Sequence, residues 1–459
     1  MSQIDARSQA CSSAARPEQI LRLRLLAQGQ VQGVGFRPFI YRLAAELHLT
    51  GSVGNTSEGV LVEVQGRAGD VRRFPVLLRE QLPPLARLTG LESEETAIVR
   101  GESEFRIVMS HGHHGHNVLI SPDVGLCPDC AADMRDPENR RHGYAFTNCT
   151  NCGPRYTITR SIPYDRAVTS MACFPMCPEC AKEYGDPLDR RFHAQPVACP
   201  ACGPRLWFVS HEEALAGRSE LTEQTMENAL ERACVCLLEG RILALRGLGG
   251  FQLACDARSA GTLGTLRQRK NRPHKSFALM VRDLETARTL CLIDEAEAEL
   301  LASPARPAVI LQAKERVLPP EVAPDIATLA VMLPTTPLHV VLFDHLAGEC
   351  LRLGRPAPVL VMTSGNDSGD PICLGNREAL ARLRHIADDF LLHNRDILCR
   401  VDDSVVACSR NPISGEAEPF FFRRARGYVP SPTPLGREAD ACSFGAGADL
   451  KATCCLTRG

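Results

Sequence analysis

One stretch of cysteines limits what this chain can fold into more than any other feature. Residues 127–155 carry two C-x-x-C pairs separated by eighteen residues, and residues 177–205 repeat this arrangement fifty residues later. Of the 29 aligned positions in the two copies, 13 are identical. The stretch is therefore an internal duplication of one small unit.

Each copy supplies four thiols, which is the number that a closed tetrahedral zinc site requires. The eight candidate ligands are Cys127, Cys130, Cys149, Cys152, Cys177, Cys180, Cys199 and Cys202. Four thiolates leave no open coordination position, so the sequence predicts two structural zinc ions rather than a catalytic one. Pairing of the knuckles within each copy is the simplest arrangement, and pairing between the copies is the alternative.

The composition indicates several domains with buried cores and reduced thiols. The chain has 459 residues, enough for about three domains of ordinary size, and a net charge of −2. Such a chain has no overall attraction to nucleic acid or to an anionic membrane, and no apolar run is long enough to cross a bilayer. Eight of the 21 cysteines lie in the duplication and the others are scattered, which favours a cytoplasmic location over a secreted disulfide protein.

Ahead of the cysteines, residues 20–109 have the periodicity of a small α+β domain. Residues 1–19 are rich in Ser, Ala and Arg without any period, which predicts a disordered tail. The order strand, helix, strand, strand, helix, strand, with the last strand at residues 105–109, is typical of a ferredoxin-like sandwich. Residues 110–122 follow as a linker. Its HGHHGH run could hold a metal ion, but a plain linker is preferred because no ligand geometry is evident.

A glycine-rich turn between the first strand and the first helix is the first candidate site. The turn consists of Gln32, Gly33, Val34, Gly35 and Phe36, and Arg37 and Pro38 open the helix. Backbone N–H groups and the helix dipole favour an anion at such a turn, and a guanidinium group suits phosphate oxygens. A tight turn without a ligand is the alternative interpretation.

The segment VQGVGFR, followed by Gly54-Asn55-Thr56, resembles the acylphosphatase family over residues 20–109. The resemblance implies that Arg37 grips a phosphate group and that Asn55 positions the attacking water. An acyl phosphate is already activated, so clamping its charge and aiming a water molecule suffice for hydrolysis.

Residues 222–430 alternate helices and strands and are predicted to form one α/β domain. The predicted elements are a helix at 222–239 and strands at 241–245, 276–281, 308–312 and 359–363. A cluster of cations precedes the second of these strands, and a Ser-Gly-Asn turn follows the last one. Because α/β sheets place ligands at strand ends, both segments are candidate ligand-binding turns. A solvated charged face is the alternative for the cations.

These turns resemble those of the YrdC/Sua-type domain, which activates a carbamoyl-type acid with ATP. The set implied by the resemblance is Lys270, Arg272, Lys275, Thr335, Ser364, Asn366 and Ser404. In this interpretation Lys270 and Arg272 neutralise the triphosphate of ATP, which binds with Mg²⁺. Ser364 and Asn366 orient the nucleotide and the acyl group.

The order of the parts is more specific than any single motif. An acylphosphatase-like domain, a duplicated C4 zinc unit at residues 123–221 and a YrdC-like domain resemble the HypF carbamoyltransferase family of NiFe-hydrogenase maturation. The resemblance implies hydrolysis of carbamoyl phosphate, adenylation of the carbamate with ATP, and transfer to the C-terminal Cys of HypE, as a precursor of the cyanide ligand. That family has a fourth, sugar-kinase-like domain, so residues 431–459 are expected to be a linker and the beginning of a truncated copy of it.

Two other functions are compatible with parts of the sequence. A threonylcarbamoyl-adenylate synthase for tRNA modification needs the YrdC-like domain but neither the phosphate loop nor the zinc units. A zinc-dependent binding module would need only the cysteines. Nucleic acid is disfavoured as a partner because Tyr156 and Trp207 are the only aromatic residues just after the knuckles, and the local arginines are balanced by acids.

Overall fold

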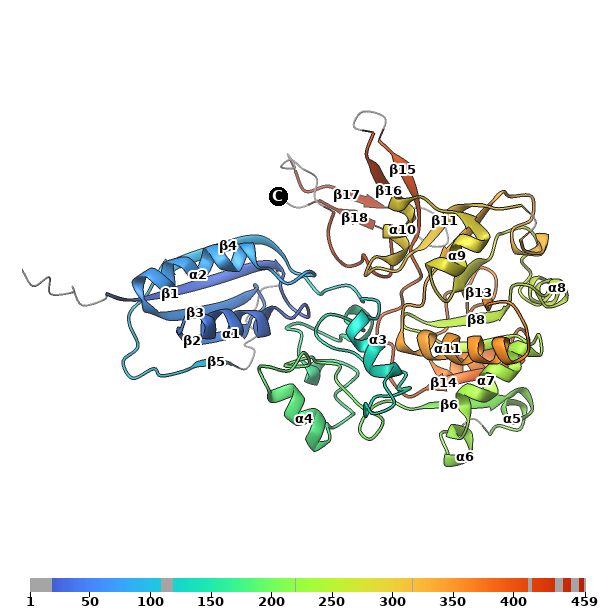
Figure 1. Ribbon diagram of the computed structural model, residues 1–459, viewed down its shortest axis with the longest axis horizontal. Coiled ribbons are helices and arrows are strands. Elements are labelled where there is room, and N and C mark those ends of the chain that lie inside the picture. Colours follow the sequence, from blue (N-terminus) through green and yellow to red (C-terminus); the bar gives the residue numbers. More distant parts are fainter. Residues whose placement is uncertain are drawn as a thin grey trace, which may run out of the picture.

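The computed structural model describes residues 19–108, 119–218, 220–315, 317–411, 415–433, 441–446 and 454–457. Three parts follow one another along the chain: a small domain (blue in Figure 1), a central region with few regular elements (cyan to green) and a large domain (green to red). Residues 1–18 of the expected tail, the HGHHGH run and most of residues 431–459 lie outside the described residues. None of the described helices combines the length and the apolar character needed to cross a membrane.

The first domain is a five-stranded sheet covered on one face by two helices that contact each other. Its elements are β1 (Ile20–Gln30), α1 (Phe36–Glu46), β2 (Thr50–Asn55), β3 (Val60–Arg67), α2 (Ala68–Glu80), β4 (Arg87–Glu95) and β5 (Phe105–Ile107). The strand order is β4-β1-β3-β2-β5. Alternate leucines of β1, including Leu23 and Leu25, are buried against the helices, as expected for a strand with one covered face. The predicted ferredoxin-like sandwich is confirmed.

One strand of this sheet is absent from the sequence prediction. β4 pairs with β1 at the edge of the sheet, and its sequence RLTGLESEE is largely exposed. An edge strand with polar side chains on both faces lacks the apolar alternation by which strands are recognised. The strand predicted at residues 105–109 is β5, which pairs with β2 on the other side.

The central region contains the two cysteine units and is mostly irregular. Its helices are α3 (Pro128–Arg135) and α4 (Pro178–Gly185), with 3-10 turns at η1 (Tyr156–Ile158) and η2 (Arg166–Val168). α3 and α4 occupy equivalent positions in the two copies. Each begins with a proline directly after the first cysteine of its copy, where a missing backbone N–H costs nothing.

The large domain is built around one mixed sheet of eleven strands. Its strands are β6 (Leu206–Ser210), β7 (Leu243–Arg246), β8 (Phe251–Asp256), β9 (Ala278–Val281), β10 (Cys291–Leu292), β11 (Ala308–Ala313), β12 (Thr328–Met332), β13 (Val359–Ser364), β14 (Asp389–His393), β15 (Val405–Arg410) and β16 (Ala417–Arg423). The order is β16-β15-β11-β12-β9-β13-β8-β7-β14-β6, and β10 pairs with β11.

Helices and two extensive apolar clusters cover this sheet. The described helical segments are α5 (His211–Leu215), α6 (Glu223–Met226), α7 (Ala229–Leu238), α8 (Ala260–Arg269), α9 (Leu284–Leu290), α10 (Glu295–Ala302), η3 (Pro320–Val322), α11 (Pro337–Arg352) and α12 (Asn376–Arg382). Neighbouring residues of β13, such as Leu360 and Val361, belong to different clusters. Burial on both faces explains the continuous apolar run in this strand. Farther along the chain, β17 (Phe444–Ala446) pairs with β18 (Cys454–Leu456).

Two boundaries of this domain differ from the sequence prediction. β6 pairs with β14 in the large sheet, so this sheet begins ahead of residue 222, within the range expected for the zinc region. The helix predicted at residues 222–239 is broken into α6 and α7, because Asn228 adopts a left-handed backbone with φ 52°.

Candidate active sites and metal centres

The phosphate loop connects β1 to α1 through two glycines in a left-handed conformation. Gly33 has φ 73° and Gly35 has φ 72°, values that other residues adopt only with strain. A Cβ atom added to Gly33 would lie 3.1 Å from Cδ of Arg155, and one added to Gly35 would lie 3.3 Å from Cβ of Thr150. Both neighbours belong to the first cysteine unit. The loop therefore uses glycine both for its turn and for its close approach to the central region.

Arg37 and Asn55 are brought to the same segment of the central region. Arg37 lies buried in the first turn of α1, and its guanidinium pairs with the carboxylate of Asp165 at 3.1 Å. At the end of β2, Nδ2 of Asn55 donates to the carbonyl oxygen of Tyr164 at 3.3 Å. Oδ1 of Asn55 is buried without a hydrogen-bond partner. A guanidinium and an amide that face one segment are what an acyl phosphate and its attacking water would need.

The central region closes over this loop. Nε of Arg155 donates to the carbonyl oxygen of Gly33 at 2.6 Å, and the backbone N–H of Tyr164 donates to Oε1 of Gln32 at 3.0 Å. A cavity of about 20 Å³ remains between the two parts, enough for about one water molecule. Burial, together with the charge of Arg37, lowers the pKa of His193 in this cavity to about 4, so the imidazole is neutral at ordinary pH. The sequence did not predict that Arg155, Tyr164 and His193 lie at this loop, because the fold brings them there from far along the chain.

The second site is a pocket of about 820 Å³ in the large domain. Six of the seven predicted nucleotide-site residues line it: Lys270, Arg272, Lys275, Thr335, Ser364 and Asn366. Ser404 is not among the lining residues. Its hydroxyl donates to the carbonyl oxygen of Arg426 at 2.9 Å and accepts from the backbone N–H of Ala425 at 2.8 Å. Its hydroxyl therefore fixes the backbone of residues 425–426, and Ser404 does not line the pocket as the sequence analysis expected.

Lys270 organises the Ser-Gly-Asn turn. Its ammonium group donates to the carbonyl oxygens of Ser364 and Asn366 at 2.7 and 2.6 Å, and to Oδ1 of Asn366 at 2.9 Å. These bonds match the three donors of an ammonium group. The lysine thus places a buried positive charge under the turn and fixes the shape of the turn at the pocket wall.

Arg272 also lines this pocket and keeps its charge there. Its Nη2 donates to the carbonyl oxygen of Ser276 at 2.6 Å, and its guanidinium lies over the ring of Phe277 at 5.2 Å. Burial and the nearby guanidinium groups of Arg267 and Arg423 lower its pKa to about 10, which leaves it a cation at neutral pH. The pocket therefore favours an anionic ligand.

A row of hydrogen-bonded polar side chains along the pocket was not predicted from sequence. Nε2 of Gln252 donates to Asp403 at 3.0 Å, and Oε1 of Gln252 lies 3.1 Å from Nε2 of His339. Arg426 donates to the other oxygen of Asp403 at 2.7 Å. Since the amide nitrogen of Gln252 is used on the carboxylate, its oxygen accepts, and His339 carries its proton on Nε2.

The surroundings of Asp403 and His339 fix the charges of both side chains. Burial alone would raise the pKa of Asp403, but the guanidinium of Arg426 keeps that pKa below its usual value. Burial lowers the pKa of His339 to about 4. Asp403 is therefore charged and His339 neutral at ordinary pH.

The eight cysteines form two clusters, one in each copy of the duplication. The four sulfurs of each cluster lie within 4.8 Å of one another. Zinc–sulfur bonds of about 2.3 Å in a tetrahedron place sulfurs about 3.8 Å apart. The distances from Cys149 to Cys127 and Cys152 are 3.7 and 3.9 Å, and those from Cys202 to Cys199 and Cys180 are 3.8 and 3.6 Å. The clusters fit two closed zinc sites, and the ligands pair within each copy.

Comparisons with known proteins find the same three parts. The acylphosphatase family model matches residues 23–107, and the model described as HypF finger matches residues 126–159 and 176–209. The Sua5/YciO/YrdC family, described as telomere recombination, matches residues 236–420. An acylphosphatase of Staphylococcus aureus is 34% identical over 86 residues, which are 19% of this chain and 97% of that protein.

The fold and the sites define a multidomain protein that joins an acylphosphatase domain to a YrdC-like domain through a duplicated zinc finger. Carbamoyltransferase HypF2 of Cupriavidus necator is 47% identical over 97% of this chain and 54% of its own length. A crystal structure of full-length HypF in its phosphate- and nucleotide-bound form superposes with a TM-score of 0.86 at 42% identity, covering 97% of this chain and 55% of that one. The chain belongs to the HypF carbamoyltransferase family and spans about half the length of the curated relatives that it matches.

Proposed function

We propose that this chain carries two consecutive steps of a HypF carbamoyltransferase. Water hydrolyses carbamoyl phosphate at the phosphate loop and releases carbamate and phosphate. In the pocket of the large domain, the carbamate then attacks the α-phosphate of ATP bound with Mg²⁺, which forms carbamoyl adenylate and releases pyrophosphate. The full reaction ends with transfer to the C-terminal Cys thiol of HypE in the cytoplasm, a step to which no residue of this chain is assigned.

One observation carries this proposal: a short segment of the central region touches both sites. The hydroxyl of Ser121 donates to the carbonyl oxygen of Gln32 in the phosphate loop at 2.7 Å. Five residues later, the backbone N–H of Leu126 donates to the carbonyl oxygen of Thr335 in the pocket wall at 3.0 Å. A free carbamate decomposes quickly, so joining the site that produces it to the site that consumes it raises the fraction captured.

The first step is tested with Arg37→Ala. Release of phosphate from carbamoyl phosphate should fall by at least about 100-fold, because a charge-stabilising group is worth roughly this factor. Arg42→Ala is the matched control, since Arg42 is exposed on the same helix. Full turnover by a folded Arg37→Ala variant would remove Arg37 from the site.

The second step is tested by exchange of labelled pyrophosphate into ATP. Exchange should require carbamoyl phosphate but not threonine, and Lys270→Ala should abolish it while leaving phosphate release intact. Lys182→Ala, at an exposed position of α4, is the control. A requirement for threonine would instead favour a threonylcarbamoyl-adenylate synthase.

A further inference from the structure

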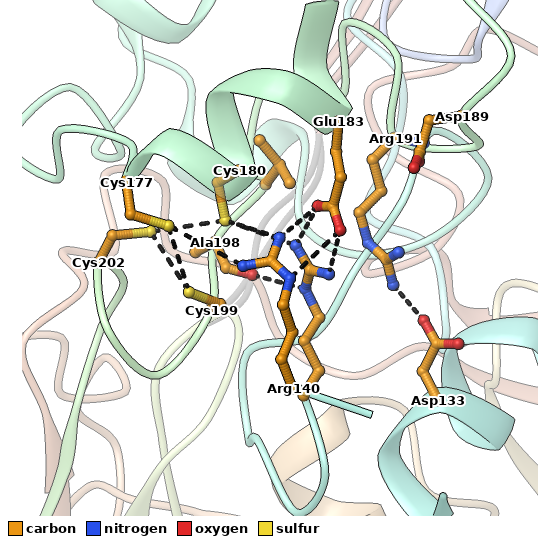
Figure 2. A network of polar contacts seen from close by, with 12 residues as sticks. Asp133, Arg140, Cys177, Cys180, Glu183, Asp189, Arg191, Ala198, Cys199 and Cys202 are labelled. Carbon is orange, nitrogen blue, oxygen red and sulfur yellow. Dashed lines mark hydrogen bonds and ion pairs between the residues drawn. The ribbon is translucent and has the colours of Figure 1, made fainter. Parts of the chain in front are cut away.

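The two arginines of the first cysteine unit reach into the second unit. Arg140 donates to Sγ of Cys180 at 3.3 Å and pairs with the carboxylate of Glu183 at 2.6 Å. Arg141 donates to the same sulfur at 3.5 Å, to Glu183 at 2.6 Å and to the carbonyl oxygen of Ala198 at 2.8 Å. Figure 2 shows the guanidinium group of Arg140 between the cysteine cluster and Glu183.

The second unit returns equivalent contacts to the first, except that among the described residues only Arg190 of its arginine pair, and not Arg191, donates to a sulfur. Arg190 donates to Sγ of Cys130 at 3.1 Å and forms an ion pair with Asp133. Arg191 also pairs with Asp133, as Figure 2 shows, and donates to the carbonyl oxygen of Asn148 at 3.2 Å. Each of these residues stands fifty positions from its counterpart in the other copy. The pattern is therefore reciprocal: the ligands of each cluster come from one copy, and its arginine pair comes from the other.

The charge of a closed zinc site explains why such a pair is useful. Four thiolates and one Zn²⁺ carry a net charge of −2, two guanidinium groups carry +2, and the carboxylate that holds them carries −1, so the pair offsets part of the negative charge around each cluster. Hydrogen bonds from outer residues to ligating sulfurs orient the ligands and tune how tightly the metal is held. Burial strengthens this effect, and Arg141 and Arg191 are only 1% and 5% exposed. The carboxylates of Glu183 and Asp133 hold the arginines in place.

We propose that the two zinc sites stabilise each other crosswise: the arginine pair of each copy offsets part of the negative charge of the other copy's thiolate shell and holds that shell in position. The duplicated unit is then one metal-dependent body rather than two independent fingers. Loss of zinc from one site removes the partner of an arginine pair. The segment of the other copy that carries this pair is then held less firmly. Both arginines stand at equivalent positions of the two copies, as this arrangement requires.

The test uses the mirror-image variants Arg140→Met and Arg190→Met in the zinc-loaded chain. Their side chains are 31% and 29% exposed, so replacement leaves the core intact. Zinc content is measured by metal analysis during competition with a chelator, and released cysteines are alkylated and identified by peptide mass spectrometry. Each variant should lose one of its two zinc ions at a chelator concentration about 10–100-fold lower than the parent chain requires.

The position of the alkylated cysteines decides the result. Arg140→Met should expose Cys177, Cys180, Cys199 and Cys202, and Arg190→Met should expose Cys127, Cys130, Cys149 and Cys152. Arg160→Met, at an exposed position of the same region, should behave like the parent chain, and Arg140→Lys should fall between. Alkylation within the mutated copy, or unchanged zinc retention in both variants, would overturn the proposal.

Discussion

At the residue scale, Arg37 is held by an anion of the protein itself. The carboxylate of Asp165, supplied by the zinc region, lies 3.1 Å from the guanidinium that the acylphosphatase resemblance assigns to a phosphate group. An incoming phosphate and this carboxylate compete for the same charge. If Arg37 binds phosphate as proposed, we expect Asp165 to lower the affinity of the empty loop for anions.

Replacement of Asp165 by Asn should tighten anion binding at the loop. We expect the inhibition constant for inorganic phosphate to fall by about tenfold, since a charged hydrogen bond worth about 1.5 kcal/mol no longer has to be given up. Inhibition of carbamoyl phosphate hydrolysis measures this constant, with Glu138→Gln as the exposed control. Weaker phosphate binding in Asp165→Asn would mean that Asp165 orients Arg37 rather than competing for it.

His339 predicts a pH dependence of the stability of the large domain. Its pKa is about 4 in the fold against 6.5 in the unfolded chain, so the unfolded state binds more protons between these values. Stability is therefore lost as the pH falls from about 6.5 to about 4, by roughly 2–4 kcal/mol from this residue. Fluorescence of Trp207, the only tryptophan and buried in β6, reports urea unfolding of this domain.

The contribution of His339 is isolated by comparing variants. The difference in unfolding free energy between the parent chain and His339→Gln should shrink as the pH falls through this window. His345→Gln, exposed on the same helix, should follow the parent chain at every pH. A difference that stays constant from pH 7 to pH 4.5 would show that folding does not shift the pKa of His339, and would contradict this prediction.

Sequence predicts Arg37, Asn55 and Lys270 as candidate site residues because each belongs to a short motif next to a strand or helix end. Asp165, Gln252 and His339 lie in no such motif. Tertiary packing alone brings them to the candidate loop or pocket, and sequence spacing carries no signal for that. Ser404 is the opposite case: the sequence motif predicts it as a site residue, but its hydroxyl bonds to the backbone of Ala425 and Arg426.

At the scale of elements, the conformation of the phosphate loop depends on its own glycine turn and on the residues of the central region that pack against it. Gly33 allows both a left-handed backbone and the contact with Arg155 and Tyr164. Elements with strong apolar periodicity, such as β1 and α1, are predictable from sequence. The edge strand β4 and the break at Asn228 are not, because a polar edge and a single left-handed residue leave the local pattern nearly unchanged.

Gly33→Ala tests this close packing. The new methyl group would lie 3.1 Å from Arg155 and 3.2 Å from Tyr164, and the residue would keep a positive φ, so we expect a cost of about 1–2 kcal/mol. Thermal unfolding of the small domain, followed by calorimetry, should shift downward, and hydrolysis of carbamoyl phosphate should fall. Gly69→Ala is the control, since a Cβ there meets nothing within 4 Å. Equal stability of the two variants would contradict the packing account.

At the scale of the molecule, the zinc region is the part that both sites share. Arg155, Tyr164 and Asp165 contact the phosphate loop and Arg37. The segment from Ser121 to Leu126 continues from this loop to the pocket wall. The order of the domains could be predicted from sequence because each carries its own motif. The contacts between them could not, because Ser121 and Leu126 are ordinary residues outside any motif.

The proposed coupling of the two reactions by the zinc region is tested by the amount of pyrophosphate exchanged for each phosphate released from carbamoyl phosphate. The zinc-loaded chain should give a constant ratio. A chain stripped of zinc by a chelator should give a lower ratio, with exchange falling more steeply than hydrolysis, and zinc should restore it. A stripped chain that keeps the full ratio would contradict the account.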